Sequence, residues 1–282
     1  MNCGMNSTEG HGSTEVMRIP KIVFSDLDGT LIRYRQPEIT QEIFDAIREL
    51  TEAGIVFCPA SGRTHQSLRK MFAPVADDVY FICENGAAVF YRGELAANRV
   101  MPRSEWLRVS HAFLEMTDGK GEVLVTSPHA AYMIDHGRGI RDAMDIQRVA
   151  YRLVDRPEDV ADPDVCKVAL FVREGVGPYL ERLSEVTKNW HPAAAAVDWM
   201  DTGCADKADG VRMVCERLGI GLSETAAFGD NYNDCPMLDL VGQPFIMDTA
   251  AAELLERYPR HMSDPAQEMR RIAAAAREGR IG

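Results

Sequence analysis

The sequence contains no long apolar run. Nothing in its 282 residues approaches the roughly 18 consecutive apolar residues that suggest a membrane-spanning helix. Residues 1–17 are rich in Gly, Ser and Thr, and they lack the apolar segment of a secretory signal. We therefore predict a disordered N-terminal tail over residues 1–17, no membrane partner and a cytoplasmic location.

Paired cysteines are also missing. The seven cysteines are odd in number and scattered, so they fit neither a disulfide framework nor the paired spacing of a zinc site. Cysteines of this kind usually serve as small buried hydrophobic residues in a reducing compartment. Their pattern agrees with the predicted location.

Basic residues are fewer than acidic residues. The chain has 31 Lys and Arg against 43 Asp and Glu, which gives a net charge of −12. This charge argues against sequence-independent binding to nucleic acid or to an anionic membrane, because both are polyanions. An acidic protein that binds a phosphate group must supply positive charge locally, from a metal ion and a few basic side chains.

The sequence does contain enough material for a large core. Hydrophobic residues make up 46% and charged residues 26%, which is ordinary for a globular protein. The length favours either one large domain or a core with a second, inserted domain. Strands and helices alternate over residues 18–85 and 197–282, as in a parallel sheet. Residues 86–196 instead show hairpin-linked strands with helices, a pattern typical of a small α+β layer. We predict a core domain over the first two ranges and an inserted domain over the third.

The most informative stretch is an apolar run over residues 21–25 that ends in two carboxylates. Such a run predicts a parallel strand buried on both faces, so Asp26 and Asp28 would lie beyond its carboxyl end, where open α/β sheets bind ligands. Two aspartates this close repel each other, which favours a bound Mg²⁺ ion. Gly29 permits the turn, and the Thr30 hydroxyl can fix the rotamer of a carboxylate. For this stretch alone, a polar strand-to-turn junction is the alternative.

Three further loops carry polar residues at the end of a predicted strand or the start of the next helix. One presents a hydroxyl and free backbone N–H groups, which can bind an anion, although a simple helix cap is the alternative. Another presents a lysine, whose charge opposes the helix dipole unless it faces an anion. The last presents two carboxylates and an amide. In chain order, these residues are Ser61 with Gly62, then Lys207, then Asp230 with Asn233 and Asp234.

Together the four loops resemble the motifs of the haloacid dehalogenase superfamily of phosphohydrolases. The resemblance covers nearly the whole chain from about residue 20, and the inserted segment is similar to the class IIB cap of the Cof-type subfamily. It implies a Rossmann-like α/β core with a parallel sheet and an inserted α+β cap. The matching motifs are Asp26-Leu27-Asp28-Gly29-Thr30, Ala60-Ser61-Gly62-Arg63, Glu84-Asn85-Gly86-Ala87, Lys207, and Gly229-Asp230 with Asn233-Asp234.

The resemblance also implies a function and a role for each matching residue. It implies a Mg²⁺-dependent phosphatase for small phosphorylated metabolites such as sugar phosphates. Asp26 would attack phosphorus to form an aspartyl-phosphate, and Asp28 would protonate the leaving group and then activate water. The metal would be held by Asp26, Asp230 and the Asp28 backbone carbonyl. Phosphate would be bound by Ser61, Gly62, Lys207 and Asn233, with Thr30 in support and Asp234 acting through a metal-bound water or by orienting Lys207.

Other functions stay open at this point. A dedicated phosphatase of the mannosyl-phosphoglycerate or sucrose phosphate type, and a phosphomutase, belong to the same superfamily. A non-enzymatic phospho-acceptor domain is a remote alternative, because such a domain has no use for Asp28 as an activator of water. The protein would act as a monomer or homodimer. One departure from the subfamily is Asp248-Thr249, where an Asn-Ala pair is usual, and it adds a carboxylate near the rim of the site.

Overall fold

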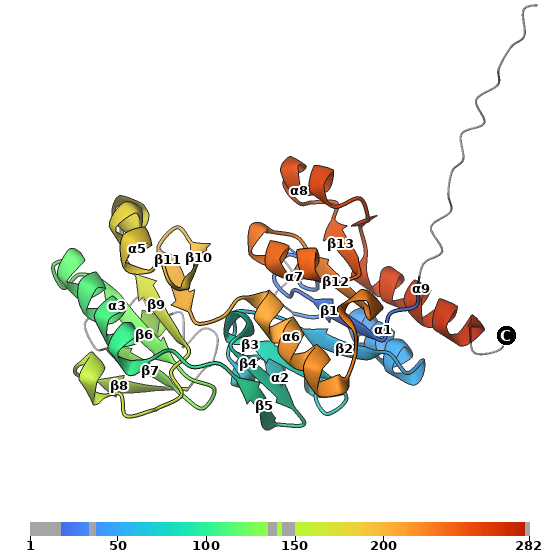
Figure 1. The fold of residues 1–282 in the computed structure, drawn as a ribbon, viewed down its shortest axis with the longest axis horizontal. Helices are drawn as coiled ribbons and strands as arrows, with labels where there is room; N and C mark the ends of the chain where they lie inside the picture. Colours follow the sequence, from blue (N-terminus) through green and yellow to red (C-terminus); the bar gives the residue numbers. More distant parts are fainter. Residues whose placement is uncertain (1–17, 34–37, 135–139, 143–149, 280–282) are drawn as a thin grey trace, which may run out of the picture.

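The computed structural model describes residues 18–33, 38–134, 140–142 and 150–279 (Figure 1). The predicted tail over residues 1–17 lies outside this part of the chain. Among the described helices, none has both the length and the apolar composition needed to cross a bilayer.

A five-stranded parallel sheet forms the centre of one part of the molecule. Its strands in spatial order are β14 (His261–Met262), β13 (Gln243–Met247), β12 (Thr225–Gly229), β1 (Ile22–Ser25) and β2 (Val56–Pro59). Every neighbouring pair is parallel. Strand β1 therefore lies inside the sheet, and its four residues are buried, as its continuous apolar run predicts.

Helices cover both faces of this sheet. Successive strand residues point to opposite faces, so Val23 packs in one apolar cluster and Phe24 in the other. The predicted α/β fold class is confirmed. The helices on the Val23 side are α1 (Gln41–Glu52), α2 (His65–Met71) and α9 (Pro265–Glu278), and those on the Phe24 side are α6 (Lys207–Leu218), α7 (Cys235–Leu240) and α8 (Ala252–Arg257).

A small antiparallel sheet extends this core. It consists of β3 (Tyr80–Cys83), β4 (Ala88–Tyr91) and β5 (Glu94–Asn98). A parallel bridge between Ala60 and Ile82 joins it to the loop that follows β2. Buried residues of β3 and β4 take part in both apolar clusters of the core, so this hairpin belongs with the five-stranded sheet.

A six-stranded sheet forms the second part, drawn to the left of the first in Figure 1. Helices α3 (Arg103–Met116) and α5 (Leu180–Val186) pack on one face, where Trp106 and Leu183 share a buried cluster. All strand pairs are antiparallel except β7 with β8. The strands in spatial order are β10 (His191–Ala196), β11 (Trp199–Gly203), β9 (Lys167–Phe171), β6 (Glu122–Thr126), β7 (Ala131–Ile134) and β8 (Tyr151–Val154).

Strand pairing suggests different domain limits from the 86–196 expected from the sequence. Strands β4 and β5 lie within that range, yet they pair with β3, which packs with the core. Strand β11 lies outside it, yet it pairs with β9 and β10. Hairpin patterns identify strands but do not show which sheet a hairpin joins. We propose that the inserted domain comprises residues 99–204, and we call it the cap.

Candidate active site

The candidate catalytic residues lie at the carboxyl edge of the five-stranded sheet. Asp26 directly follows β1, and Asp230 directly follows β12. Ser25 pairs with Phe228 of β12 and with Pro59 of β2, so the three strands end at the same level. The Asp26 N–H continues this register by donating to the Phe228 carbonyl at 2.9 Å.

Lys207, the first residue of α6, links two of the carboxylates. Its ammonium group donates to Asp26 Oδ1 and, at 2.6 Å, to Asp234 Oδ1, and all three side chains are buried. Burial alone would lower the pKa of Lys207, but the charges of Asp234 and Asp26 outweigh it, so the pKa is raised. The lysine therefore stays protonated and supplies the local positive charge that an acidic protein needs.

Asp26 has one carboxylate oxygen that is left for other chemistry. Its Oδ1 accepts from Lys207, whereas its Oδ2 is buried and has no hydrogen-bond partner among the described residues. Burial, followed by the charge of Asp234, raises the pKa of Asp26 well above its usual range, although Lys207 opposes this shift. An unpartnered carboxylate oxygen is costly in a buried site, and an electrophile or a hard cation would satisfy it.

Asp230 brings a second carboxylate close to Asp26. Carboxylate oxygens of Asp26, Asp230 and Asp234 lie within 4.8 Å of one another, and carboxylates are the ligands that Mg²⁺ prefers. Burial and then the charge of Asp234 raise the pKa of Asp230, while Thr30 Oγ1 donates to its Oδ1 at 3.1 Å. Gly29 lies so close that a Cβ there would be 2.2 Å from Asp230 Oδ2, and its φ of +105° also favours glycine.

Both oxygens of Asp234 are already engaged by the protein. Its Oδ1 accepts from Lys207, and its Oδ2 accepts from the N–H groups of Asp230 and Asn231 at 3.0 and 3.1 Å. This arrangement leaves Asp26 and Asp230 as the carboxylates with capacity for a metal ion. Of the two roles open to Asp234 from the sequence, the contacts favour orienting Lys207.

Comparison with known proteins identifies the family. A family model described as haloacid dehalogenase-like hydrolase matches residues 23–266. The chain belongs to the haloacid dehalogenase-like hydrolases. The family and the hydrolase activity predicted from the motifs are thus confirmed.

Relatives of this hydrolase include named phosphatases. It is 26% identical over 246 residues to 5-amino-6-(5-phospho-D-ribitylamino)uracil phosphatase YbjI of Escherichia coli, with 83% of this chain and 88% of that protein covered. It is also 26% identical over 248 residues to the HMP-PP phosphatase of Cronobacter sakazakii, with 83% and 86% covered.

Solved structures share the fold. A haloacid dehalogenase-like hydrolase from B. subtilis has a TM-score of 0.75 at 20% identity, with 88% of this chain and 98% of that chain covered. The subclass IIB sugar phosphatase BT4131 has a TM-score of 0.74 at 20% identity, with 93% and 100% covered. The predicted combination of an α/β core with a class IIB cap is therefore confirmed.

The Asp28 carboxylate of the hydrolase contacts Arg63. Arg63 Nε and Nη2 donate to its two oxygens at 3.0 and 2.8 Å, and the Asp28 side chain is 53% exposed. Sequence analysis assigned no role to Arg63. The only available signal was its place in the motif after β2, because a contact across 35 residues depends on the tertiary fold.

The remaining predicted residues differ in how they are placed. Ser61 is buried in the loop that follows β2, and its Oγ accepts from the Arg63 N–H at 3.3 Å. Asn233 is exposed, and among the described residues no hydrogen bond joins its side chain to Asp26, Asp230 or Lys207. Asp248 is exposed directly after β13, at the edge of the sheet where the other site residues lie.

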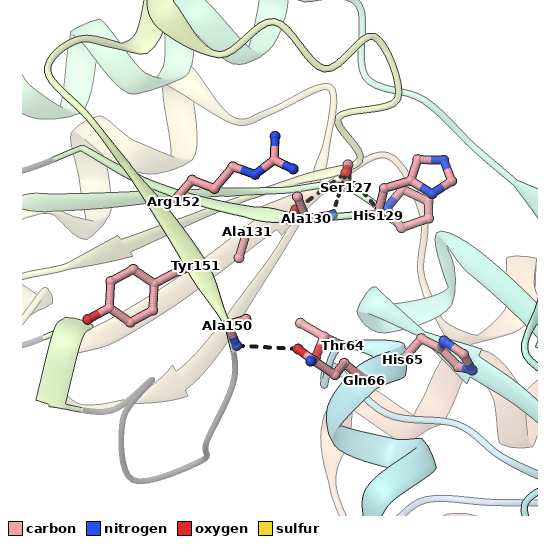
Figure 2. Close-up of a pocket in the computed structure, with 11 residues that line it drawn as sticks. Thr64, His65, Gln66, Ser127, His129, Ala130, Ala131, Ala150, Tyr151 and Arg152 are labelled. Atoms are coloured by element: carbon pink, nitrogen blue, oxygen red, sulfur yellow. Dashed lines mark hydrogen bonds between the residues drawn. The ribbon is translucent and has the colours of Figure 1, made fainter.

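A pocket of about 440 Å³ lies between the core and the cap (Figure 2). The core side is the first turn of α2, directly after Arg63. The cap side is the β6–β7 hairpin and β8, and the Ala150 N–H donates to Gln66 Oε1 across the gap at 3.3 Å. The residues lining it are Thr64, His65, Gln66, Ser127, Pro128, His129, Ala130, Ala131, Ala150, Tyr151 and Arg152.

His65 at this pocket makes the stability of the protein depend on pH. Its ring stacks on Phe90 with centroids 3.8 Å apart, and its Nε2 is buried without a hydrogen-bond partner in the part of the chain that the structure describes. Burial, assisted by the charge of Arg69, lowers the pKa of His65 to about 4. The unfolded chain takes up this proton near pH 6.5, so folding stability falls as the pH decreases from about 6.5 towards 4.

We expect His65→Phe to weaken this pH dependence. Phenylalanine keeps the stacking on Phe90 but has no group to protonate. Between pH 7 and pH 5, the wild type should lose up to about 2 kcal/mol more unfolding free energy than the variant. Urea denaturation at both pH values measures the difference, and equal losses in the two proteins would contradict the prediction.

Proposed function

We propose that this hydrolase is a Mg²⁺-dependent phosphatase for small phosphorylated metabolites and acts through an aspartyl-phosphate. The observation that carries the proposal is the asymmetry of Asp26. One of its oxygens is held by Lys207, and the other is buried and unpartnered beside Asp230. A nucleophile needs one free oxygen in a site where positive charge offsets the repulsion by a phosphate dianion.

The first half of the proposed reaction transfers the phosphoryl group to Asp26. Its Oδ2 forms a bond to phosphorus while the bond between phosphorus and the ester oxygen breaks. Asp28 donates a proton to the departing alkoxide. Lys207 stays protonated and offsets the charge of Asp26. Mg²⁺ bound by Asp26, Asp230 and the Asp28 carbonyl would neutralise charge on the phosphoryl oxygens.

The second half releases phosphate. Asp28 now takes a proton from a water molecule, whose oxygen bonds to phosphorus while the bond from phosphorus to Asp26 breaks. The products are inorganic phosphate and the regenerated Asp26 carboxylate. Ser61 and the Gly62 N–H would bind a phosphoryl oxygen throughout, since they lie in the loop between β2 and α2, at the carboxyl edge of the sheet.

The pocket between core and cap supports a small polar leaving group. Its volume of about 440 Å³ lies in the range of small-molecule sites, and Gln66, His129 and Arg152 line it with polar groups. The related phosphatases are named for small phosphorylated compounds, which agrees with this size. Membership of a hydrolase family argues against a phospho-acceptor that keeps its phosphoryl group.

A phosphate-release screen tests the proposal. The full chain is incubated with Mg²⁺ and a panel of sugar phosphates, nucleotides and cofactor phosphates. We expect release from at least one compound, loss of release after EDTA treatment and recovery when Mg²⁺ is restored. No release from any compound would contradict the proposal. A single substrate preferred by orders of magnitude would indicate a dedicated phosphatase, and an isomerised phosphate would indicate a phosphomutase.

A further inference from the structure

A second buried ion cluster joins the cap to the core, separate from the carboxylates around Lys207. Lys167 of β9 contacts Glu84 Oε2 at 2.8 Å and Asp201 Oδ2 at 3.3 Å. These side chains are only 8%, 1% and 9% exposed. Glu84 follows β3 in the core, whereas Lys167 and Asp201 belong to the cap sheet.

The lysine of this cluster also holds the loop that we propose binds phosphate. Lys167 Nζ donates to the Gly62 carbonyl at 2.9 Å. The carbonyls on either side are held by backbone groups of the core. The Asn85 N–H donates to the Ser61 carbonyl at 3.0 Å, and the Glu84 N–H donates to the Arg63 carbonyl at 3.1 Å. Of these three donors, Lys167 uses its side chain and belongs to the cap, whereas Asn85 and Glu84 use backbone N–H groups and belong to the core.

These three bonds fix the direction of the N–H groups in the loop. A trans peptide is planar, so its C=O and its N–H point in opposite directions. With the Ser61 carbonyl turned towards Asn85, the Gly62 N–H points the other way. With the Gly62 carbonyl turned towards Lys167, the Arg63 N–H points away from the cluster and donates to Ser61 Oγ. A loop that binds an anion needs its N–H groups fixed in this manner.

The charges of the cluster favour a lasting contact. Burial would lower the pKa of Lys167, but the charges of Asp201 and Glu84 outweigh it and raise the pKa, so the ammonium group keeps its donors. Asp201 is held in turn by Asn85 Nδ2 at 3.2 Å and by Trp199 Nε1 at 2.8 Å. Hydrogen bonds between charged groups in a buried site are stronger than those between neutral groups.

We propose that Lys167 is a positioning residue that orients the Gly62–Arg63 peptide and thereby makes phosphate binding depend on the docked cap. This inference rests on the proposed function. When the cap sheet is docked, the lysine keeps the loop in its anion-binding form. When the lysine is absent, the Gly62–Arg63 peptide is free to turn, and the Arg63 N–H no longer holds the Ser61 hydroxyl that we propose binds phosphate.

Kinetics of Lys167→Met test the proposal. The loop binds substrate and transition state alike, so we expect KM to rise about tenfold while kcat changes less than about threefold. The inhibition constant of inorganic phosphate should rise by a similar factor. A purely structural role would instead lower the active fraction, and so kcat, with KM unchanged. An unchanged KM and an unchanged inhibition constant would overturn the proposal.

Thr126→Val provides a matched control. Thr126 Oγ1 donates to Glu84 Oε2 at 3.0 Å, so the variant removes another bond between cap and core in the same cluster without touching the Gly62 carbonyl. We expect its KM and phosphate inhibition constant to stay within twofold of the wild type. If Thr126→Val raised both constants as much as Lys167→Met, the specific role of Lys167 would be refuted.

A second variant covers the case in which Lys167→Met does not fold, because it leaves two buried carboxylates without a cation. Combining it with Glu84→Gln removes one of these charges, and Asp201 keeps its bonds from Asn85 and Trp199. The same rise in KM is expected. In the wild type, adding inorganic phosphate with Mg²⁺ should slow solvent exchange of the Lys167 ammonium protons, measured by NMR, and unchanged exchange would contradict the coupling. A wild type that releases no phosphate would refute the proposed function instead.

Discussion

Asp26→Asn should reduce phosphate release at least about 10³-fold, because an amide oxygen is a poor nucleophile and cannot form the aspartyl-phosphate. The side chain keeps its size, and Lys207 retains its bond to Asp234. The loss should therefore appear in kcat with the fold intact. Phosphate release with the preferred substrate of the screen, measured with Mg²⁺ in excess, gives the comparison.

The same substitution should leave stability unchanged or increase it. The pKa of Asp26 is raised in the folded protein, so its ionised form costs folding free energy at neutral pH, and asparagine removes that cost. Asp45→Asn is a matched control, because Asp45 is an exposed residue of α1 and should keep full activity. Full activity in Asp26→Asn would refute the proposal that Asp26 is the nucleophile. A lower unfolding free energy of the variant would show that the ionised Asp26 does not destabilise the fold.

The sequence predicted the sheet and its carboxyl edge well, because both depend on local pattern. The apolar run that forms β1 can be buried on both faces only inside a parallel sheet, and the residues that follow such strands must share one edge. The same pattern predicts that Asp26, Ser61, Lys207 and Asp230 lie near one another. In the structure Lys207 contacts Asp26, a carboxylate oxygen of Asp230 lies near Asp26, and Ser61 follows the neighbouring strand β2.

Contacts between side chains far apart in the chain could not be predicted. Arg63 and Asp28 meet across two loops, and Lys167 reaches the Gly62 carbonyl from another sheet. From the sequence alone, a basic residue on a strand could be a solvated side chain as easily as a buried partner of a distant loop, since nothing local shows what faces it. The limits that we propose for the cap differ from those expected from the sequence for the same reason, because hairpin patterns do not reveal which sheet gains a strand. Function at this site therefore depends partly on pairings that only the fold defines.

Lys207→Met should produce the largest loss of stability. The substitution leaves Asp26 and Asp234 buried without their shared cation, and breaking a buried ion pair from one side costs about 3–5 kcal/mol. Methionine fills a similar volume and suits the first turn of α6, so the loss should come from charge. Urea denaturation in the absence of Mg²⁺ measures it, and Lys188→Met, at an exposed cap residue, should change stability by less than about 0.5 kcal/mol.

Two further measurements separate this charge effect from a packing defect. The carboxylates left by Lys207→Met attract a cation more strongly, so added Mg²⁺ should stabilise the variant more than the wild type. Lys207 opposes the raised pKa of Asp26, so without the lysine this pKa should lie still further above its value in the unfolded chain. The folded variant then binds protons more readily than the unfolded chain. The difference in unfolding free energy between the variant and the wild type should therefore shrink as the pH falls from 7 to 5. If the stability lost in Lys207→Met changes with neither Mg²⁺ nor pH, Lys207 acts by packing, and the electrostatic basis proposed for this site is wrong.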